Sequence, residues 1–323
     1  MPHRSDAARH PSPDAGPLRF GLLGTGPWAA STHAPALRAH PDVEFVGVWG
    51  RRAEAADVLA ERFGTRRYDE VDALLDDCDA VAVALPPDVQ APLAVRAAEA
   101  GCHLLLDKPV ATEPRAAAHI ADAAERNRVA SVVFFTLRFA TATADWIDAR
   151  AAADGWLLGR ADWLSPVFGG ADSPYSASPW RQEKGALWDV GPHALSVLLP
   201  VLGDVTEVAA AAGPGDTVHL TLRHEGGASS TVSVSHTVPP EAAGVTAEVR
   251  GPAGVATLPE RDAPPTEAFA NAVDALRDAA RTGVPHDCDV HMGRRVTEIL
   301  ARAEAELDTP GRAAGARPVS TGR

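Results

Sequence analysis

The chain has 323 residues, of which 46% are hydrophobic and 23% are charged. That length exceeds one ordinary domain and the composition is that of a globular protein, so we expect two domains. The formal net charge of −13 argues against a nucleic acid or an anionic membrane as partner, because either would favour a basic face.

No run approaches the ~18 consecutive apolar residues of a membrane span, and the beginning of the chain has no apolar leader segment. The three cysteines form no CxxC pair, which is typical of a reducing cytoplasm. We therefore expect a cytoplasmic protein. Residues 1–17 are rich in Pro, His, Asp and Arg, residues 309–323 carry Gly, Pro, Ser and Arg, and we expect both to be disordered tails.

From residue 18 onward, short apolar runs alternate with longer amphipathic runs. They predict strands at Arg19–Leu23, Glu44–Trp49, Ala80–Ala84, His103–Leu106 and Ala130–Phe135, with helices near Ala29–Ala39, Ala53–Phe63, Gln90–Ala100 and Pro114–Asn127. Apolar strands that alternate with helices of this length are typical of a doubly wound parallel sheet. We predict an α/β domain of this kind over residues 18–138.

The pattern of predicted elements changes after about residue 139, where strands follow one another with little helix between them. The pattern predicts a helix at Thr143–Ala153, a strand at Trp156–Leu164, a loop at Ser165–Glu183, a helix running to about Leu202, strands at Thr206–Ala211, Thr217–His224, Ser229–His236 and Val245–Arg250, and helices at Glu267–Arg281 and Cys288–Leu307. Successive strands indicate a large mixed or antiparallel sheet. We predict an α+β domain over residues 139–308.

A glycine-rich loop follows the first predicted strand and leads directly into a helix. It reads Gly24-Thr25-Gly26-Pro27-Trp28-Ala29, which is G-x-G-x-x-A in the strand–turn–helix setting of the dinucleotide fingerprint. The first glycine permits the tight turn, the second lets the backbone approach a pyrophosphate, and the alanine allows close packing of helix on strand. The loop predicts a Rossmann domain that binds NAD or NADP.

The end of the second strand indicates which nucleotide is preferred. NAD-binding domains usually carry an acid there, which accepts hydrogen bonds from the ribose 2′-hydroxyl. This chain has Gly50-Arg51-Arg52 instead, and two guanidinium groups favour a 2′-phosphate through charge-assisted bonds. NADP is therefore the preferred cofactor and NAD the alternative, unless the two arginines are merely solvated at a helix start.

Three further residues point to proton transfer. Lys108 follows the fifth strand, where ligands of open α/β sheets bind, and Asp189 and His193 are four residues apart in a segment that predicts a helix. Residues at that spacing share one helical face, so we expect the Asp189 carboxylate to hydrogen-bond the His193 ring and to favour its charged form. An oriented histidine of this kind suits proton exchange with a substrate hydroxyl.

Taken together, these motifs resemble the Gfo/Idh/MocA oxidoreductases, the glucose–fructose oxidoreductase and inositol dehydrogenase type, over residues 18–307. Asp107-Lys108-Pro109 is similar to the family's Glu-Lys-Pro motif and Asp189-Val190-Gly191-Pro192-His193 to its D-x-G-x-H motif. The resemblance implies that His193 is the acid/base, that Lys108 binds and polarises the reacting oxygen, and that Asp189 orients them. It also implies a sugar- or cyclitol-like polyol or its ketone as substrate, and a homo-oligomer formed through the C-terminal sheet.

The remaining site predictions concern the rims of the two domains. We assign Leu85, Pro86, Pro87, Gln90 and Asp107 to the cofactor, together with the loop at 24–28 and residues 50–52, and we assign Arg138 and Trp180 to the substrate, together with Lys108 and His193. Leu85-Pro86-Pro87 and Gln90 stand where many members have Thr-Pro-Asn and a later His, so a particular sugar specificity is not transferred. The run His286–His291 contains metal-ligand residue types, but it lacks four ligands at a recognised spacing, and we predict no metal.

Two other functions are compatible with the same motifs. One is an NAD-dependent glycosidase, which would retain its nucleotide and turn over without net change in its redox state. The other is a non-catalytic protein that senses the nucleotide. The presence of Lys108, Asp189 and His193 together favours the dehydrogenase over the sensor.

Overall fold

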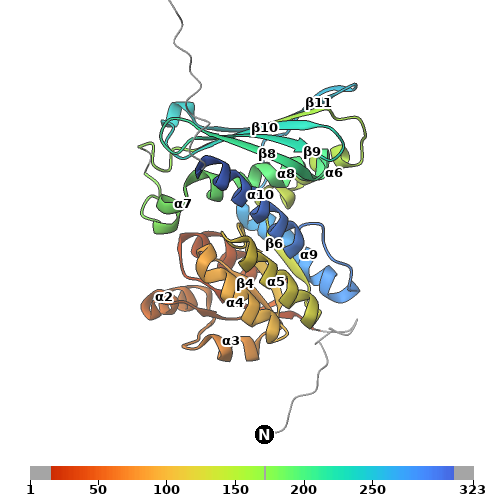
Figure 1. Ribbon diagram of the computed structural model, residues 1–323. Helices are drawn as coiled ribbons and strands as arrows, with labels where there is room; N and C mark the ends of the chain where they lie inside the picture. The colour runs from red at the N-terminus through yellow and green to blue at the C-terminus, as the bar shows by residue number, and fades with distance from the viewer. Residues whose placement is uncertain (1–15, 171, 309–323) are drawn as a thin grey trace, which may run out of the picture.

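The computed structural model describes residues 16–170 and 172–308, and it contains two six-stranded sheets that lie in separate layers (Figure 1). The predicted tails lie almost wholly outside the described residues. The first sheet has the order β3-β2-β1-β4-β5-β6 and all its paired strands are parallel. The doubly wound α/β fold is therefore confirmed.

The central strands of the first sheet are short, apolar and buried, as parallel strands require, whereas the edge strand β3 consists of two arginines. The strands of this sheet are β1 (Leu18–Leu23), β2 (Val43–Trp49), β3 (Arg66–Arg67), β4 (Ala80–Val83), β5 (His103–Asp107) and β6 (Ser131–Phe134). The helices that cover them are α1 (Ala34–Ala39), α2 (Ala53–Phe63), α3 (Val71–Asp77), α4 (Pro87–Glu99) and α5 (Pro114–Asn127). The pattern missed β3 and α3, which are too short to show a period.

The helix after the glycine loop begins as a π-helix over Ala29–His33, and α1 continues it. In an α-helix the residue four positions after Ser31 would donate its N–H to the Ser31 carbonyl, but this residue is Pro35, which has none. The wider turn places the fully buried ring of His33 with its Nε2 3.7 Å from the Asp107 carboxylate. Single π-helical turns of this kind are frequent at functional sites.

The second sheet has the order β12-β11-β7-β10-β9-β8. Its strands are β7 (Leu158–Leu164), β8 (Val205–Ala212), β9 (Val218–His224), β10 (Ser229–Ser235), β11 (Gly244–Gly251) and β12 (Gly254–Thr257). The pair β7–β10 is parallel and the other neighbours are antiparallel, so the predicted mixed sheet is confirmed. The helices α6 (Thr141–Ala151) and α8 (Gly191–Leu202) pack together, and α8 covers β7 and β10.

The segment that was predicted as one helix around Asp189 is two helices. The first, α7 (Pro179–Asp189), is kinked at Gly185, where φ is 64°, and α8 starts after Val190. Pro192 causes this break, because it lacks the N–H that a continuous helix would donate to the carbonyl four residues earlier. The span Pro179–Leu202 is apolar and long enough to cross a membrane, but 83% of its most apolar window is buried inside the protein, as in a core helix.

The last two helices return to the first domain after the second sheet is complete (Figure 1). Helix α9 (Pro265–Thr282) packs against β5, β6 and α1, and α10 (Val290–Asp308) packs against α5 and β8. The Asp289 carboxylate accepts hydrogen bonds from the N–H groups of His291 and Met292 and so caps α10. The two domains are thereby held together by a helix that contacts both.

Candidate active site

A cavity of about 750 Å³ lies at the carboxyl ends of the first-domain strands, where ligands of open α/β sheets bind. Gly24 has φ of +132°, and a Cβ at this residue would lie 2.3 Å from the carbonyl oxygen of Ala84. At Gly26 a Cβ would meet no atom within 4 Å. Gly24 therefore makes the turn, and Gly26 leaves an open approach to the backbone, as a bound pyrophosphate requires.

Most of the residues predicted for the cofactor line this cavity, and the second domain closes it from the other side. The wall consists of Thr25, Gly26, Pro27, Trp28, Gly50, Arg51, Arg52, Ala84, Leu85, Pro86, Pro87, Asp107, Lys108, Pro174, Tyr175, Ala177, Ser178, Pro179, Trp180 and Arg181. Arg51 and Arg52 are exposed at the rim, and within the described part of the chain neither guanidinium has an ion-pair partner. A dinucleotide fits this cavity in size and in charge.

Gln90 does not line the cavity, so the prediction that it contacts the cofactor is wrong. Its side chain is completely buried. The amide nitrogen donates to the carbonyl oxygens of Asp107, Pro109 and Val110 at 2.8, 3.1 and 3.3 Å, and the amide oxygen accepts the N–H of Asp107 at 3.0 Å. Gln90 therefore supplies hydrogen-bond partners to the backbone of the turn that carries Lys108. This turn includes a cis peptide bond between Lys108 and Pro109.

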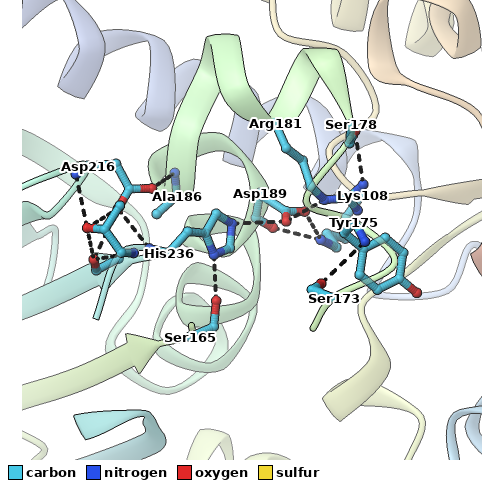
Figure 2. A network of polar contacts seen from close by, with 12 residues as sticks. Lys108, Ser165, Ser173, Tyr175, Ser178, Arg181, Ala186, Asp189, Asp216 and His236 are labelled. Carbon is cyan, nitrogen blue, oxygen red and sulfur yellow. Dashed lines mark hydrogen bonds and ion pairs between the residues drawn. The ribbon is translucent and has the colours of Figure 1, made fainter. Parts of the chain in front are cut away.

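Lys108 and Asp189 form an ion pair between the two domains. The Lys108 ammonium donates to the Asp189 carboxylate at 3.0 Å and to the Asp189 backbone carbonyl at 2.7 Å. The same carboxylate accepts hydrogen bonds from Arg181 Nε at 2.7 Å and from His236 Nε2 at 3.1 Å (Figure 2). Burial alone would raise the pKa of Asp189, but Lys108, the His236 bond and Arg181 hold that pKa well below its usual value.

His193 does not pair with Asp189, so the predicted hydrogen bond within one helix is wrong. The break at Pro192 places the two residues on different helices, and His193 instead stacks on Trp163 with ring centroids 4.9 Å apart. Its Nδ1 is buried and has no hydrogen-bond partner within the described residues. Nε2 is therefore the ring nitrogen that a ligand can reach.

The charge state predicted for His193 is also wrong. Burial and the Lys108 cation hold the pKa of His193 well below its usual value, and the Asp189 carboxylate only partly opposes them. The imidazole is therefore neutral at neutral pH. A neutral ring is able to accept a proton from a hydroxyl group.

His193 faces a second cavity, of about 530 Å³. The wall contains Trp28, Asp107, Lys108, Thr136, Leu137, Trp163, Ser165, Val167, Tyr175, Arg181, Asp189, Val190, His193, His236, Val245, Leu258, Pro259, Glu260 and Arg261. Five of these residues, namely Trp28, Asp107, Lys108, Tyr175 and Arg181, also line the first cavity. The two cavities therefore meet at Lys108. The rest of the second cavity combines apolar residues such as Val245 and Leu258 with the charged residues Glu260 and Arg261.

Two residues that were predicted to contact substrate lie elsewhere. Arg138 is buried outside both cavities, with its guanidinium 3.6 Å from the Asp148 carboxylate. It points away because it lies on a short 3-10 turn whose neighbours Thr136 and Leu137 take the cavity wall instead. Trp180 lines the nucleotide cavity rather than the second one, and its ring packs against the Arg181 guanidinium.

Asp107, at the junction of the cavities, has an unusual charge state. Burial raises its pKa to about 7, against the opposing effects of the Lys108 and Arg181 cations. Its neighbour His33 is deeper, and burial lowers the pKa of that ring to about 3. His33 is therefore uncharged near neutral pH, and Asp107 is partly protonated there, next to the Lys108 cation.

Sequence reasoning missed seven polar residues of the second cavity: Thr136, Ser165, Tyr175, Arg181, His236, Glu260 and Arg261. Arg181 directly follows Trp180, which was assigned to the substrate, so its position was accessible from the sequence. His236 follows the last residue of β10 and is distant from every motif. No signal in the sequence links it to Asp189, because the contact joins residues 47 positions apart.

The cavities, the glycine loop and the Lys108–Asp189 pair define a two-domain protein of the dinucleotide-binding class. Residues 18–135 match the model of the oxidoreductase family with NAD-binding Rossmann fold, named for Gfo, Idh and MocA, and residues 146–257 match the C-terminal domain of that family. The chain therefore belongs to the Gfo/Idh/MocA oxidoreductase family, as the motifs indicated.

Two curated relatives illustrate which proteins this chain is similar to in sequence. A dTDP-3,4-didehydro-2,6-dideoxy-alpha-D-glucose 3-reductase from Streptomyces violaceoruber is 34% identical over 206 residues, which are 62% of this chain and 59% of that protein. A D-glucoside 3-dehydrogenase from Escherichia coli is 31% identical over 203 residues, 58% of this chain and 54% of that protein. The chain thus spans less than two thirds of the length of these relatives.

Solved structures support the fold over most of the chain. A levoglucosan dehydrogenase in complex with NADH and levoglucosan superposes with a TM-score of 0.79 at 20% identity, covering 90% of this chain and 96% of that one. GenD2 from gentamicin A biosynthesis, in complex with NAD, gives a TM-score of 0.78 at 23% identity, covering 92% and 95%. At this level of identity the likeness concerns the fold alone.

Proposed function

We propose that the protein is an NAD(P)-dependent oxidoreductase that interconverts a ring carbinol and its ketone on a sugar- or cyclitol-like substrate. One observation carries this proposal: the cavity that holds His193 joins the nucleotide cavity at the Lys108–Asp189 pair. A nicotinamide bound there would accept or supply the hydride. The relatives named as a sugar 3-reductase and a glucoside 3-dehydrogenase support a hexose ring as the substrate class.

Each member of the catalytic set has a role that follows from its environment. The Lys108 ammonium binds the reacting oxygen and stabilises the negative charge that develops on it. Asp189 holds that ammonium in place through the pair at 3.0 Å. His193, neutral and open at Nε2, takes the hydroxyl proton during oxidation and returns it during reduction.

The first experiment is a screen of D-glucose, methyl glucosides, levoglucosan and myo-inositol with NAD⁺ and NADP⁺, and of their ketones with the reduced nucleotides. Absorbance of the reduced nicotinamide reports turnover. Net conversion identifies an oxidoreductase. A tightly retained nucleotide with glycoside cleavage and no net redox change would instead indicate a glycosidase, and nucleotide binding without any turnover would indicate a sensor.

The role of His193 is tested with His193→Asn, which keeps much of the shape and removes the titrating group. Loss of general acid–base catalysis should lower kcat by ~10²–10⁴-fold, whereas nucleotide affinity should persist because the phosphate loop is in the other domain. Lys108→Met should also abolish turnover, and the double variant should be little worse than either single one. Wild-type kcat in His193→Asn would refute the assignment, and loss of folding would show a structural role.

We also propose that NADP is preferred over NAD, because Arg51 and Arg52 are at the rim of the nucleotide cavity without carboxylate partners among the described residues. A charge-assisted hydrogen bond contributes about 1.5–3 kcal/mol. Arg51→Ala should therefore weaken NADP binding by tenfold or more and leave NAD binding nearly unchanged, as measured by titration calorimetry. Equal losses for both nucleotides, or a wild-type preference for NAD, would contradict this proposal.

A further inference from the structure

The histidine that a carboxylate orients in this site is His236. Its ring is 1% exposed and lines the second cavity from the end of β10. Nε2 lies 3.1 Å from Asp189 Oδ2, and Nδ1 lies 2.5 Å from the Ser165 hydroxyl. Figure 2 shows the ring between these two partners, with Lys108 and Arg181 on the far side of Asp189.

These two hydrogen bonds determine the tautomer of the neutral ring. An ionised carboxylate only accepts hydrogen bonds, so Nε2 carries the hydrogen that bonds Asp189. Nδ1 then has the lone pair and accepts the Ser165 O–H. The ring is therefore oriented from both sides, and its N–H is committed to one oxygen of Asp189.

A second set of bonds fixes the backbone of His236. The Asp216 carboxylate accepts the His236 N–H at 2.8 Å and the Ser235 and Thr237 hydroxyls at 3.0 Å, all on Oδ1. Its other oxygen accepts the N–H of Ala186 at 3.2 Å. Asp216 therefore ties the end of β10 to α7, the helix that ends at Asp189.

We propose that His236 is a positioning residue for the catalytic pair: by occupying Oδ2 of Asp189, it keeps Oδ1 on the Lys108 ammonium. Arg181 also bonds Oδ2, but it precedes Asp189 by eight residues within α7 and so gives the carboxylate no link to another element. His236 ties the carboxylate to the second sheet instead. This inference rests on the proposed function, because it assigns a consequence to the placement of Lys108.

A role for His236 in passing protons through Asp189 is disfavoured. The cations of Lys108 and Arg181 both contact the carboxylate. Opposite charges at this distance favour its ionised form, so Asp189 resists taking up the proton of Nε2. Orientation of the carboxylate, rather than proton transfer, is what the contact supports.

The chain offers a direct readout of Lys108, because it contains only two lysines, Lys108 and Lys184. Lysine labelled with ¹³C at Cε gives one NMR signal from each, and Lys184→Arg assigns them. His236→Gln keeps an amide N–H near the position of Nε2, whereas His236→Ala removes the donor. His219→Gln is the matched control, because the ring of this exposed histidine of β9 is hydrogen-bonded to Ser233 of the same sheet and lines neither cavity among the described residues.

We expect His236→Gln and His219→Gln to keep the wild-type Cε shift and pH titration of Lys108, and His236→Ala to change both. Nucleotide affinity should be unchanged in all three. Where the screen has given an active substrate, kcat should fall ~10²-fold in His236→Ala, the scale of a displacement of about 1 Å, and should recover in His236→Gln. If His236→Ala does not fold, Ser165→Ala replaces it, and it should displace the Lys108 signal by a smaller amount.

An unchanged Lys108 signal in His236→Ala or its replacement would overturn the inference. Equal impairment of His236→Gln and His236→Ala would also overturn the inference, because the imidazole ring itself, rather than its N–H donor, would then be essential. A wild-type protein that turns over nothing in the screen would defeat the proposed function only. The lysine signals need no substrate, so they decide the role of His236 separately.

Discussion

The position of Gln90 predicts that this residue stabilises the fold and acts on the site only through the backbone. In Gln90→Leu, a change of similar size, the N–H of Asp107 and the carbonyls of Asp107 and Pro109 lose their partners inside the protein. An unsatisfied buried polar group costs about 1–3 kcal/mol. For these three groups, the free energy of unfolding should fall by about 3–9 kcal/mol.

Urea unfolding and thermal scans of the nucleotide-free protein measure this loss. Gln182→Leu is the matched control, because its amide makes one exposed bond to Ser176 and surface substitutions usually change stability by less than about 0.5 kcal/mol. Turnover should fall in Gln90→Leu as well, since the Lys108 turn loses its support. Weaker nucleotide binding with unchanged stability would refute this reasoning and restore the direct cofactor contact that the sequence suggested.

Two further predictions concern the phosphate loop and the junction of the cavities. Gly24→Ala should abolish nucleotide binding in calorimetry and lower stability, because its Cβ would lie 2.3 Å from the Ala84 carbonyl oxygen; wild-type affinity would contradict the role of Gly24 in the turn. Asp107→Asn should be more stable than wild type at about pH 8 but not at about pH 4. Burial raises the pKa of Asp107 from 3.8 to about 7, so folding binds a proton in that interval and wild-type stability falls as pH rises through it. Each pKa unit corresponds to about 1.4 kcal/mol, so the gain should be a few kcal/mol in urea unfolding, and no gain would exclude a buried, uncharged carboxyl.

The local features of this protein follow from short stretches of sequence. Apolar runs of four to seven residues between amphipathic helices are sufficient to predict a parallel sheet, because such strands are buried on both faces. The Gly24–Ala29 loop is equally local, since its conformation depends on two missing side chains. Lys108 could be placed at the carboxyl edge of the sheet for the same reason: it follows a strand directly.

Pro192 is a further local signal in the sequence, and it opposes the prediction from helical spacing. Asp189 and His193 are four residues apart, and the period alone predicts a shared face. Pro192 lies between them and cannot continue the first helix, so a new helix starts at Gly191, and this steric effect dominates over the spacing. The stacking of His193 on Trp163 then depends on where β7 passes, which no pattern within residues 185–193 specifies.

Only the tertiary structure determines which residues bond to one another across the site. Asp189 bonds Lys108, which is 81 residues away, and His236, which is 47 residues away. Helix α9 returns to the first sheet although it follows the second, and its amphipathic pattern is compatible with either. Hydrophobic periodicity specifies that a face is buried but not against which element, because apolar burial is non-directional. The residues that orient a catalytic group are therefore fixed by packing between distant segments, and the sequence specifies them only through the completed fold.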